Sequence, residues 1–207
     1  YTDTVAPLLY PMWLMSVPTL LDMEKMITHQ ELHGDGKLVK YTAAEMQGQV
    51  VFISHQWLGY GHPDPKVEQL VVLKRVLSRL MEGEIPVVDA HVILRMMFKD
   101  TTAVTAAEWK AALPSAHFWL DYFGIPGITV REANDTVKKA ETLAALQAAV
   151  ESIPAYVELS ALMLILAPMC AHADSGDVCS FPTWRSRGWC RMELAAAFLA
   201  RNELRIM

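Results

Sequence analysis

The chain has 207 residues, of which 53% are hydrophobic and 20% charged, so it can build a sizeable core and its composition excludes intrinsic disorder. Its length fits one domain with an extension. The net charge of -5 is opposite to the basic excess of nucleic-acid-binding proteins, so we expect no nucleic-acid partner. An odd number of cysteines, 3, favours free thiols and a cytoplasmic location.

The first 45 residues are predicted to form an extended arm that packs on the domain. Residues 5–21 are apolar, but Pro7, Pro11 and Pro18 interrupt them, which argues against a membrane-spanning helix. No basic segment precedes this stretch, so we expect neither a signal peptide nor a membrane partner. The first residue is Tyr1 rather than Met, so we expect a piece of a longer protein, with a domain over 46–207 that is truncated at its C-terminus.

The next elements follow from hydrophobic periodicity. The β-branched run 50–54 predicts a buried strand, and apolar residues at helical spacing predict a helix over 66–83. Residues 87–113 are predicted to be mostly helical. The apolar and aromatic run 117–123 predicts a second strand.

The remainder of the chain continues the same alternation. Residues 135–152 predict a helix that Pro154 interrupts, and the apolar run 161–167 predicts a third strand. A loop over 169–185 is expected to lead into a helix from Ser186 to about Arg201, followed by a fourth strand over 204–207.

Short apolar strands alternating with helices predict an α/β fold, a flavodoxin-like three-layer arrangement with a mostly parallel central sheet and strand 50–54 near its centre. In such sheets the carboxyl ends of the strands border a common crevice, where ligands bind. Ser54, His55 and Trp57 follow the first strand, and Asp121 lies near the end of the second. We therefore expect these side chains to border one site.

The C-terminal helix carries a second group of candidate residues. Trp189 and Glu193 are four positions apart and share one helix face, at the margin of an apolar stripe where burial would raise the pKa of Glu193. Arg185, Arg187 and Arg191 cluster at the start of this helix, where the backbone N–H groups and the helix dipole favour anions.

Three segments together resemble a known family. VVFISHQW is similar to the first strand and following loop of Toll/interleukin receptor (TIR) domains, and Trp189-Cys190-x-x-Glu193 resembles their WCxxE motif. WLDYFGIP also resembles a segment of the fungal heterokaryon-incompatibility domain, a TIR relative. The resemblance covers roughly residues 25–207 and is closest to TIR-like domains in large multidomain proteins of unicellular algae.

The resemblance implies a signalling function and a catalytic role for Glu193. In catalytic TIR domains this glutamate is essential for cleaving NAD+ at the nicotinamide ribosyl bond. A carboxylate suits an oxocarbenium-like transition state because its negative charge stabilises the developing positive charge. NAD+ is then a substrate, and no cofactor is expected. One departure from the family pattern is Gly127, where a glutamine is expected after Ile-Pro.

The residues expected to bind substrate are Ser54, His55, Trp57, Asp121, Arg187 and Trp189. Each candidate also has a structural interpretation. Glu193 could pair with an arginine, and Trp189 could pack to position its helix. His55 could bond to loop backbone, and Asp121 could cap a helix or pair with an arginine.

Other chemistries have weaker support in the sequence. Cys170, His172, Asp174 and Cys179 lie close together but match no standard zinc spacing, so no metal site is expected. The chain has no phosphate-binding GxxxxGK[ST] or GxGxxG motif and no GxSxG nucleophile motif.

Three hypotheses remain open. The first is an NAD+ glycohydrolase of the TIR type, and the second is a non-catalytic TIR-like module that self-associates or binds other TIR-like domains. The third is a sensor that binds NAD+ or a related nucleotide without cleaving it. The enzyme hypothesis requires Glu193 to face an open pocket with Ser54 or His55 across it.

Overall fold

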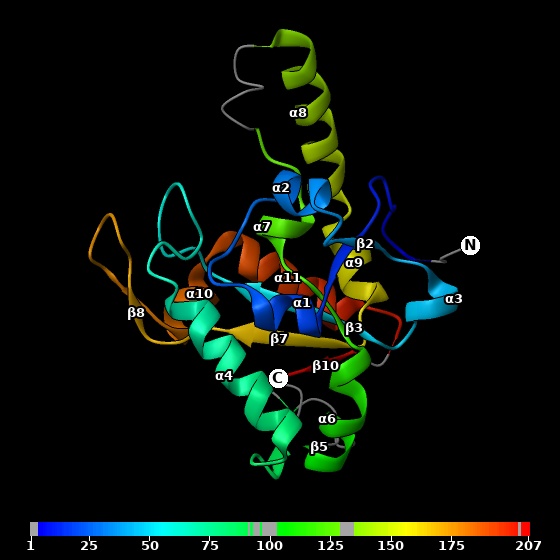
Figure 1. Ribbon diagram of the computed structural model, residues 1–207, viewed down its shortest axis with the longest axis vertical. Coiled ribbons are helices and arrows are strands. Elements are labelled where there is room, and N and C mark those ends of the chain that lie inside the picture. The colour runs from blue at the N-terminus through cyan, green and yellow to red at the C-terminus, as the bar shows by residue number, and fades with distance from the viewer. Residues whose placement is uncertain (1–3, 91, 93–95, 97–102, 129–134, 203) are drawn as a thin grey trace.

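The computed structural model describes residues 4–90, 92, 96, 103–128, 135–202 and 204–207. Within these residues the chain forms a six-stranded sheet with helices on both faces (Figure 1). Across the sheet, the strands are β10 (Arg205–Ile206), β7 (Leu162–Leu166), β3 (Val50–His55), β6 (His117–Trp119), β1 (Trp13–Ser16) and β2 (Val39–Lys40).

The sheet is mostly parallel. β3 pairs in parallel with β7 on one side and β6 on the other, and β10 pairs in parallel with β7. Numbered along the chain, these four strands have the spatial order 2-1-3-4, which is the order at the start of a flavodoxin-like sheet. The predicted α/β class, the mostly parallel sheet and the central place of strand 50–54 are confirmed.

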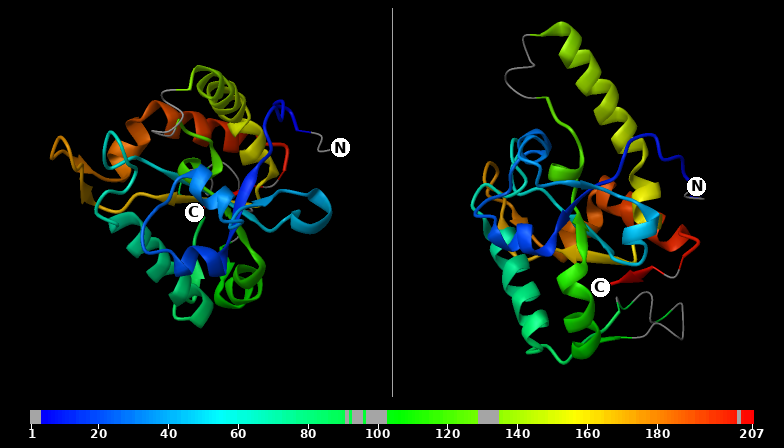
Figure 2. Two further views of the ribbon diagram at one scale, coloured as in Figure 1. Left: turned by 45° about the horizontal axis from the view of Figure 1, so that its top comes forward. Right: turned by 45° about the vertical axis from the view of Figure 1, so that its right-hand side comes forward.

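Side-chain alternation along β3 creates a core on each face of the sheet. Val51 and Ile53 pack with α1 (Val17–Asp22), α4 (Glu68–Glu82) and α6 (Ala106–Ala112), whereas Val50 and Phe52 pack with α9 (Ile153–Leu159) and α11 (Gly188–Leu199). Figure 2 shows α4 and α11 on opposite sides of the sheet. All six residues of β3 are buried, as a central strand covered on both faces requires.

α4 shows how the local sequence specifies an element. Leu70, Leu73, Leu77 and Leu80 recur every three or four residues and are buried against the sheet. The helix ends at Gly83, whose φ of 77° is the left-handed conformation that glycine adopts without steric cost. The helix predicted over 66–83 is confirmed.

Smaller elements connect these layers. They are α2 (His29–Gly34), α3 (Ala43–Met46), the 3-10 helix η1 (Leu113–Ser115), α7 (Asp121–Gly124), α8 (Thr136–Glu151), α10 (Phe181–Ser186), and the paired strands β4 (Val87–Val88) with β5 (Val104–Thr105) and β8 (Cys170–Ala171) with β9 (Val178–Cys179). α8 projects beyond the layers (Figure 1). In the part of the chain that the structure describes, no helix is both long and apolar enough to cross a membrane.

The N-terminal residues are more than an arm lying on a finished domain. Ser16 and Met15 of β1 pair antiparallel with His117 and Phe118 of β6, and β1 also pairs with β2. Two strands from the first 45 residues therefore extend the same sheet as the rest of the chain. Residue 45 marks no boundary in the sheet.

Two predictions in the middle of the chain are refined. Residues 87–113 were predicted to be mostly helical, and Val92, Met96, the seven-residue helix α6 and the start of η1 are helical, whereas the two-residue strands β4 and β5 were not predicted; 91, 93–95 and 97–102 lie outside the described residues. The predicted strand 117–123 ends at Trp119, because Asp121–Gly124 forms the helical turn α7.

A third correction concerns the segment before the last helix. The predicted loop 169–185 contains the hairpin β8–β9 and most of α10. Ser186 is the last residue of α10 rather than the start of the next helix, and α11 begins at Gly188 after Arg187. Short helices and two-residue strands have too few positions to show a period in the sequence.

Candidate functional site

The end of β3 sends polar side chains to both faces of the sheet. Successive strand residues point in opposite directions, so Ser54 lies beneath α10 and α11, whereas His55 lies beneath α4. Ser54 is fully buried and His55 is 6% exposed. The carboxyl end of the central strand thus contributes to two hydrogen-bonded groups at the same edge.

The first group joins Ser54 to Glu193. The Trp184 indole N–H donates to Ser54 Oγ over 3.0 Å, and the Ser54 hydroxyl donates to Glu193 Oε2 over 2.5 Å. Because an indole nitrogen can only donate, the serine proton is directed to the carboxylate. Glu193 Oε1 has no hydrogen-bond partner among the described residues, and Glu193 lines a pocket.

The environment of Glu193 favours its neutral form. Glu193 is 7% exposed, and burial raises its pKa to about 8 from an ordinary value of 4.5. The negative charge of Asp121 acts in the same direction, while the Ser54 hydrogen bond and His55 act against it.

The second group holds His55 between two acceptors. His55 Nδ1 lies 2.7 Å from Gln69 Oε1, and His55 Nε2 lies 2.8 Å from Asp121 Oδ1. The Gln69 amide nitrogen already donates to the Gln56 carbonyl, so its oxygen must face the imidazole. Both ring nitrogens therefore donate, which defines a protonated imidazolium.

Asp121 is the counter-ion of this imidazolium. Its Oδ2 accepts from the Trp57 indole over 2.8 Å, and its Oδ1 accepts from the Tyr122 backbone N–H over 2.6 Å. Burial alone would raise the pKa of Asp121, but the charge and hydrogen bond of His55, together with these donors, lower it overall. Burial alone would lower the pKa of His55, and Asp121 and Gln69 raise it overall.

These groups border a pocket of about 480 Å³ at the carboxyl edge of the sheet. Its lining includes six residues that the sequence marked as site candidates: His55, Trp57, Asp121, Arg187, Trp189 and Glu193. The seventh candidate, Ser54, does not line the pocket, but its hydroxyl donates a hydrogen bond to Glu193, which does. One wall is apolar and is formed by Ile125, Val150 and Ile153.

The alternative structural roles of the candidates can be compared with their contacts in the structure. Glu193 pairs with Ser54 rather than with an arginine, and Trp189 is 60% exposed, so its ring does not pack in the core. Asp121 is the first residue of α7 and pairs with His55 rather than an arginine. His55 bonds through its ring to side chains.

Several residues of this site were not predicted from the sequence. Gln69 accepts a hydrogen bond from His55, and Trp184 donates one to Ser54, so each orients its partner. Tyr60 and His172 line the pocket. A polar Gln69 beside the buried stripe of α4 was a detectable signal, since a buried amide needs partners. Trp184 gave no such signal because its segment was predicted to be a loop.

The cysteines lie apart from the pocket floor, except Cys190. All three are free and buried, and Cys170 lies opposite Cys179 across β8 and β9. Burial raises the pKa of Cys190 to about 12, so its thiol is neutral and donates to the His55 carbonyl. Among the described residues, no group of three or more His, Cys, Asp or Glu side chains could hold a metal ion.

The fold and site together define an α/β protein with a buried carboxyl group in a pocket at the carboxyl edge of its sheet. No family model, curated protein or solved structure matches the chain.

Proposed function

We propose that this chain is a TIR-like signalling domain that cleaves NAD+ between nicotinamide and ribose, with Glu193 as the essential carboxylate. The observation that carries the proposal is the position of Glu193. Its Oε2 is held by Ser54, its Oε1 has no partner among the described residues, and it lines a pocket while being 7% exposed.

The raised pKa of Glu193 suits a cationic substrate. The pyridinium ring of NAD+ carries a positive charge, and an opposite charge nearby favours the ionised carboxylate. Binding of the substrate would therefore expel the proton that burial holds on Glu193. In the free protein the same carboxyl stays mostly neutral, so no uncompensated charge is buried.

The chemistry requires one fixed negative charge near the ribose. As the C1′–N bond breaks, its electron pair neutralises the nicotinamide ring and positive charge develops on the ribose. Water then adds to C1′ and releases a proton. The Glu193 carboxylate stabilises the developing charge, and its orientation is fixed by Ser54, which Trp184 holds in turn.

The pocket is suited to part of a nucleotide. Its volume of about 480 Å³ lies within the range of small-molecule sites. The apolar wall of Ile125, Val150 and Ile153 and the exposed rings of Tyr60 and Trp189 offer surfaces for a flat heterocycle. Arg187 adds a positive charge at the mouth.

Nicotinamide release from NAD+ tests the proposal. Glu193→Gln keeps the shape of the side chain and removes its charge, and we expect it to lower turnover by about 100- to 1,000-fold. Glu141→Gln on exposed α8 is the matched control and should leave turnover unchanged. Equal turnover in Glu193→Gln would remove this residue from the mechanism.

The pH profile supplies a second readout of the same proposal. Because the ionised form of Glu193 is required, kcat/KM should rise with pH up to about 8 and then level off.

The alternative is a non-catalytic TIR-like interaction module. The observation in its favour is α8, which projects from the layers and exposes 68% of Val137 and 44% of Leu143. An assembled wild-type protein that releases no nicotinamide would favour this alternative.

A further inference from the structure

The hairpin β8–β9 contributes His172 to the pocket wall, and this residue has no role in the proposed reaction. It is inserted between β7 and α10, and it is fastened to the loop after β3 at two points. The Ala173 N–H donates to the Leu58 carbonyl over 2.6 Å, and the Tyr60 N–H donates to Asp174 Oδ2 over 2.8 Å. This hairpin places His172 on the pocket.

The loop of the hairpin fixes the proton of His172. Its Nδ1 accepts from the backbone N–H groups of Asp174 and Ser175, at 3.4 and 3.3 Å. A ring nitrogen that accepts carries no proton, so Nε2 carries it and is a donor. Nε2 has no hydrogen-bond partner among the described residues.

This donor faces the pocket rather than the protein interior. His172 is 7% exposed and lines the pocket. The described buried polar atoms that are sealed from solvent without a partner are those of Asp64, Trp109, His117 and Trp119. Nε2 of His172 is not among them, so it reaches solvent from a side chain that is more than nine-tenths buried.

The start of α11 lies on the same pocket. Gly188, Trp189 and Cys190 are its first three residues, and all three line the pocket. The residue before them, Arg187, provides no side-chain cap, so the first backbone N–H groups of this 12-residue helix lack a capping oxygen. Free N–H groups at a helix start favour anions.

Arg187 connects the helix and the hairpin electrostatically. Burial raises the pKa of both Cys179 and Cys190, and the positive charge of Arg187 acts against that rise at each thiol. Cys179 belongs to the hairpin and Cys190 to α11, so the guanidinium lies within electrostatic reach of both elements.

The acidic groups of the pocket do not oppose an anion at this mouth. The charge of Asp121 is balanced by the His55 imidazolium, and in the free protein burial keeps Glu193 neutral near pH 7. Asp174 keeps its charge, but its carboxylate accepts from the Tyr60 backbone N–H and does not line the pocket. Arg187 therefore remains the uncompensated charge among the described pocket-lining side chains.

We infer that the pocket mouth is a phosphate subsite, formed by the His172 Nε2–H, Arg187 and the first N–H groups of α11. The inference rests on the proposed function in one respect, since NAD+ would place its pyrophosphate here while Glu193 faces the ribose. A fixed neutral donor, a guanidinium and backbone N–H groups together match the several oxygens of a pyrophosphate.

Two substitutions at His172 separate the two roles of its ring, the Nε2–H that faces the pocket and the Nδ1 that accepts from the loop backbone. In His172→Asn the side-chain oxygen can accept from the Asp174 and Ser175 N–H groups, as in an Asx-turn, but no donor reaches the Nε2 position. His172→Gln carries an amide to about the Nε2 position and loses the loop contact. Thermal melts of both variants report the structural role.

Calorimetric titration with inorganic pyrophosphate, ADP-ribose and nicotinamide riboside tests the subsite. We expect His172→Asn to melt close to wild type and to bind pyrophosphate and ADP-ribose about 10-fold or more weakly. His172→Gln should melt lower and lose less affinity. Nicotinamide riboside has no phosphate, so its affinity should not change in His172→Asn.

Arg187→Gln and Arg185→Gln form the matched pair for charge. Both remove one exposed arginine near the start of α11, but only Arg187 lines the pocket. We expect Arg187→Gln to weaken pyrophosphate binding and Arg185→Gln to leave it within about twofold of wild type.

The outcomes distinguish the subsite from the proposed reaction. Unchanged pyrophosphate affinity in His172→Asn, or no binding by the wild type, would overturn the subsite even if nicotinamide release depends on Glu193. Loss of pyrophosphate binding in His172→Asn would support the subsite even if the wild-type protein releases no nicotinamide.

Discussion

Glu193 and His55 lie at the same buried edge of the sheet, and both hold a proton near neutral pH, which leaves His55 charged and Glu193 neutral. His55 is 6% exposed and keeps its proton because two acceptors face it. Glu193 is 7% exposed and keeps its proton because water is excluded and Asp121 lies nearby. At neutral pH the pair Asp121–His55 is ionic and Glu193 is neutral, so the buried site carries no net charge. A cationic substrate would change this balance at Glu193.

The sequence placed Glu193 at the margin of the buried face, where burial would raise its pKa. In the structure Glu193 is 7% exposed, so it cannot be treated as a surface group. Its contribution to the free energy of unfolding should depend on pH.

The sign of this dependence follows from the raised pKa. Between the ordinary pKa of 4.5 and the folded-state pKa of about 8, the folded protein holds the proton and the unfolded chain has released it. The stabilisation is therefore complete below pH 4.5 and is lost as the pH rises toward 8.

Urea denaturation of wild type and Glu193→Gln measures this effect. The difference in the free energy of unfolding should shift in favour of the variant by up to about 1.4 kcal/mol per pH unit between about pH 5 and about pH 8. Titrations outside this residue are common to both proteins and cancel in the difference. Curves that stay parallel over this range would contradict a raised pKa.

At the scale of elements, the junction of β6 and α7 places Asp121 in the site. The predicted strand 117–123 was too long because its partner β3 pairs only with residues up to Trp119. The backbone then turns into α7, where the Gly124 N–H donates to the Leu120 carbonyl and the Ile125 N–H to the Asp121 carbonyl. This turn directs the Asp121 carboxylate toward His55.

Gly124 is required for close packing in this junction. A Cβ atom at Gly124 would lie 2.5 Å from Trp119 Nε1, and Trp119 is fully buried and stacked on Phe52. The indole has no room to move, so Gly124→Ala should destabilise the protein by about 1–3 kcal/mol.

Gly127→Ala is the matched control for this substitution. A Cβ atom at Gly127 would meet nothing within 4 Å, so the free energy of unfolding should change by less than about 0.5 kcal/mol. Chemical denaturation of both variants measures the contrast. Equal stabilities would show that the β6–α7 junction can open without cost.

Local patterns predicted the elements whose stabilising contacts show in their own sequence. The buried strands 50–54 and 161–167 and the helix over 66–83 have enough buried residues for their period to appear. The helix over 135–152 was also predicted, although Ala149 is the residue that it buries. The placement of Ser54, His55 and Asp121 at one sheet edge followed from the parallel topology alone.

The remaining features depend on partners distant in the chain. β1 is a strand because Met15 and Ser16 meet Phe118 and His117 about 100 residues later, and no local period announces that pairing. The hairpin that carries His172 is held by the loop after β3. A short stretch of sequence cannot predict contacts between segments that are far apart in the chain. The pocket of about 480 Å³ is formed by several segments of this kind, so its shape could not be predicted either.

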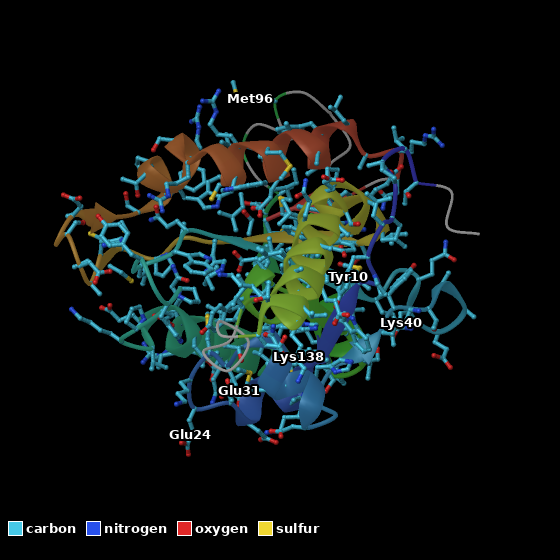
Figure 3. All side chains as sticks on the ribbon, turned by 90° about the horizontal axis from the view of Figure 1, so that it is seen from above. Tyr10, Glu24, Glu31, Lys40, Met96 and Lys138 are labelled. Atoms are coloured by element: carbon cyan, nitrogen blue, oxygen red, sulfur yellow. The ribbon has the colours of Figure 1, made fainter. Side chains whose placement is uncertain are left out.

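Trp57 and Asp121 also line a second pocket, which lies between the site and the outer helices. It is lined by residues of α2 and the start of α8, including Glu31 and Lys138, which Figure 3 labels on the same side of the molecule. Gln30 of α2 bonds through its side-chain amide to both the N–H and the carbonyl of Gly127. α2 therefore holds the segment that follows α7 in place.

At the scale of the whole molecule, the N-terminal residues complete the sheet on the side that carries Asp121. β1 sends Leu14 into the core under α9 and Met15 into the core under α4, and both are fully buried. A strand that contributes to both cores should unfold together with them, rather than as a separate arm. Leu14→Ala would leave a cavity beside β6 in the core that α9 covers.

We expect Leu14→Ala to lower the free energy of unfolding by about 2–5 kcal/mol, because a buried leucine loses its packing and leaves a cavity. Leu9→Ala, at a leucine that is 52% exposed, should change it by less than about 0.5 kcal/mol. Urea denaturation followed by far-UV circular dichroism and by tryptophan fluorescence measures both. Coincident transitions in Leu14→Ala with a lower midpoint would show that β1 folds with the sheet that holds the site. A wild-type midpoint in Leu14→Ala would instead show that the N-terminal strand adds nothing to the stability of the sheet, and that the site forms without it.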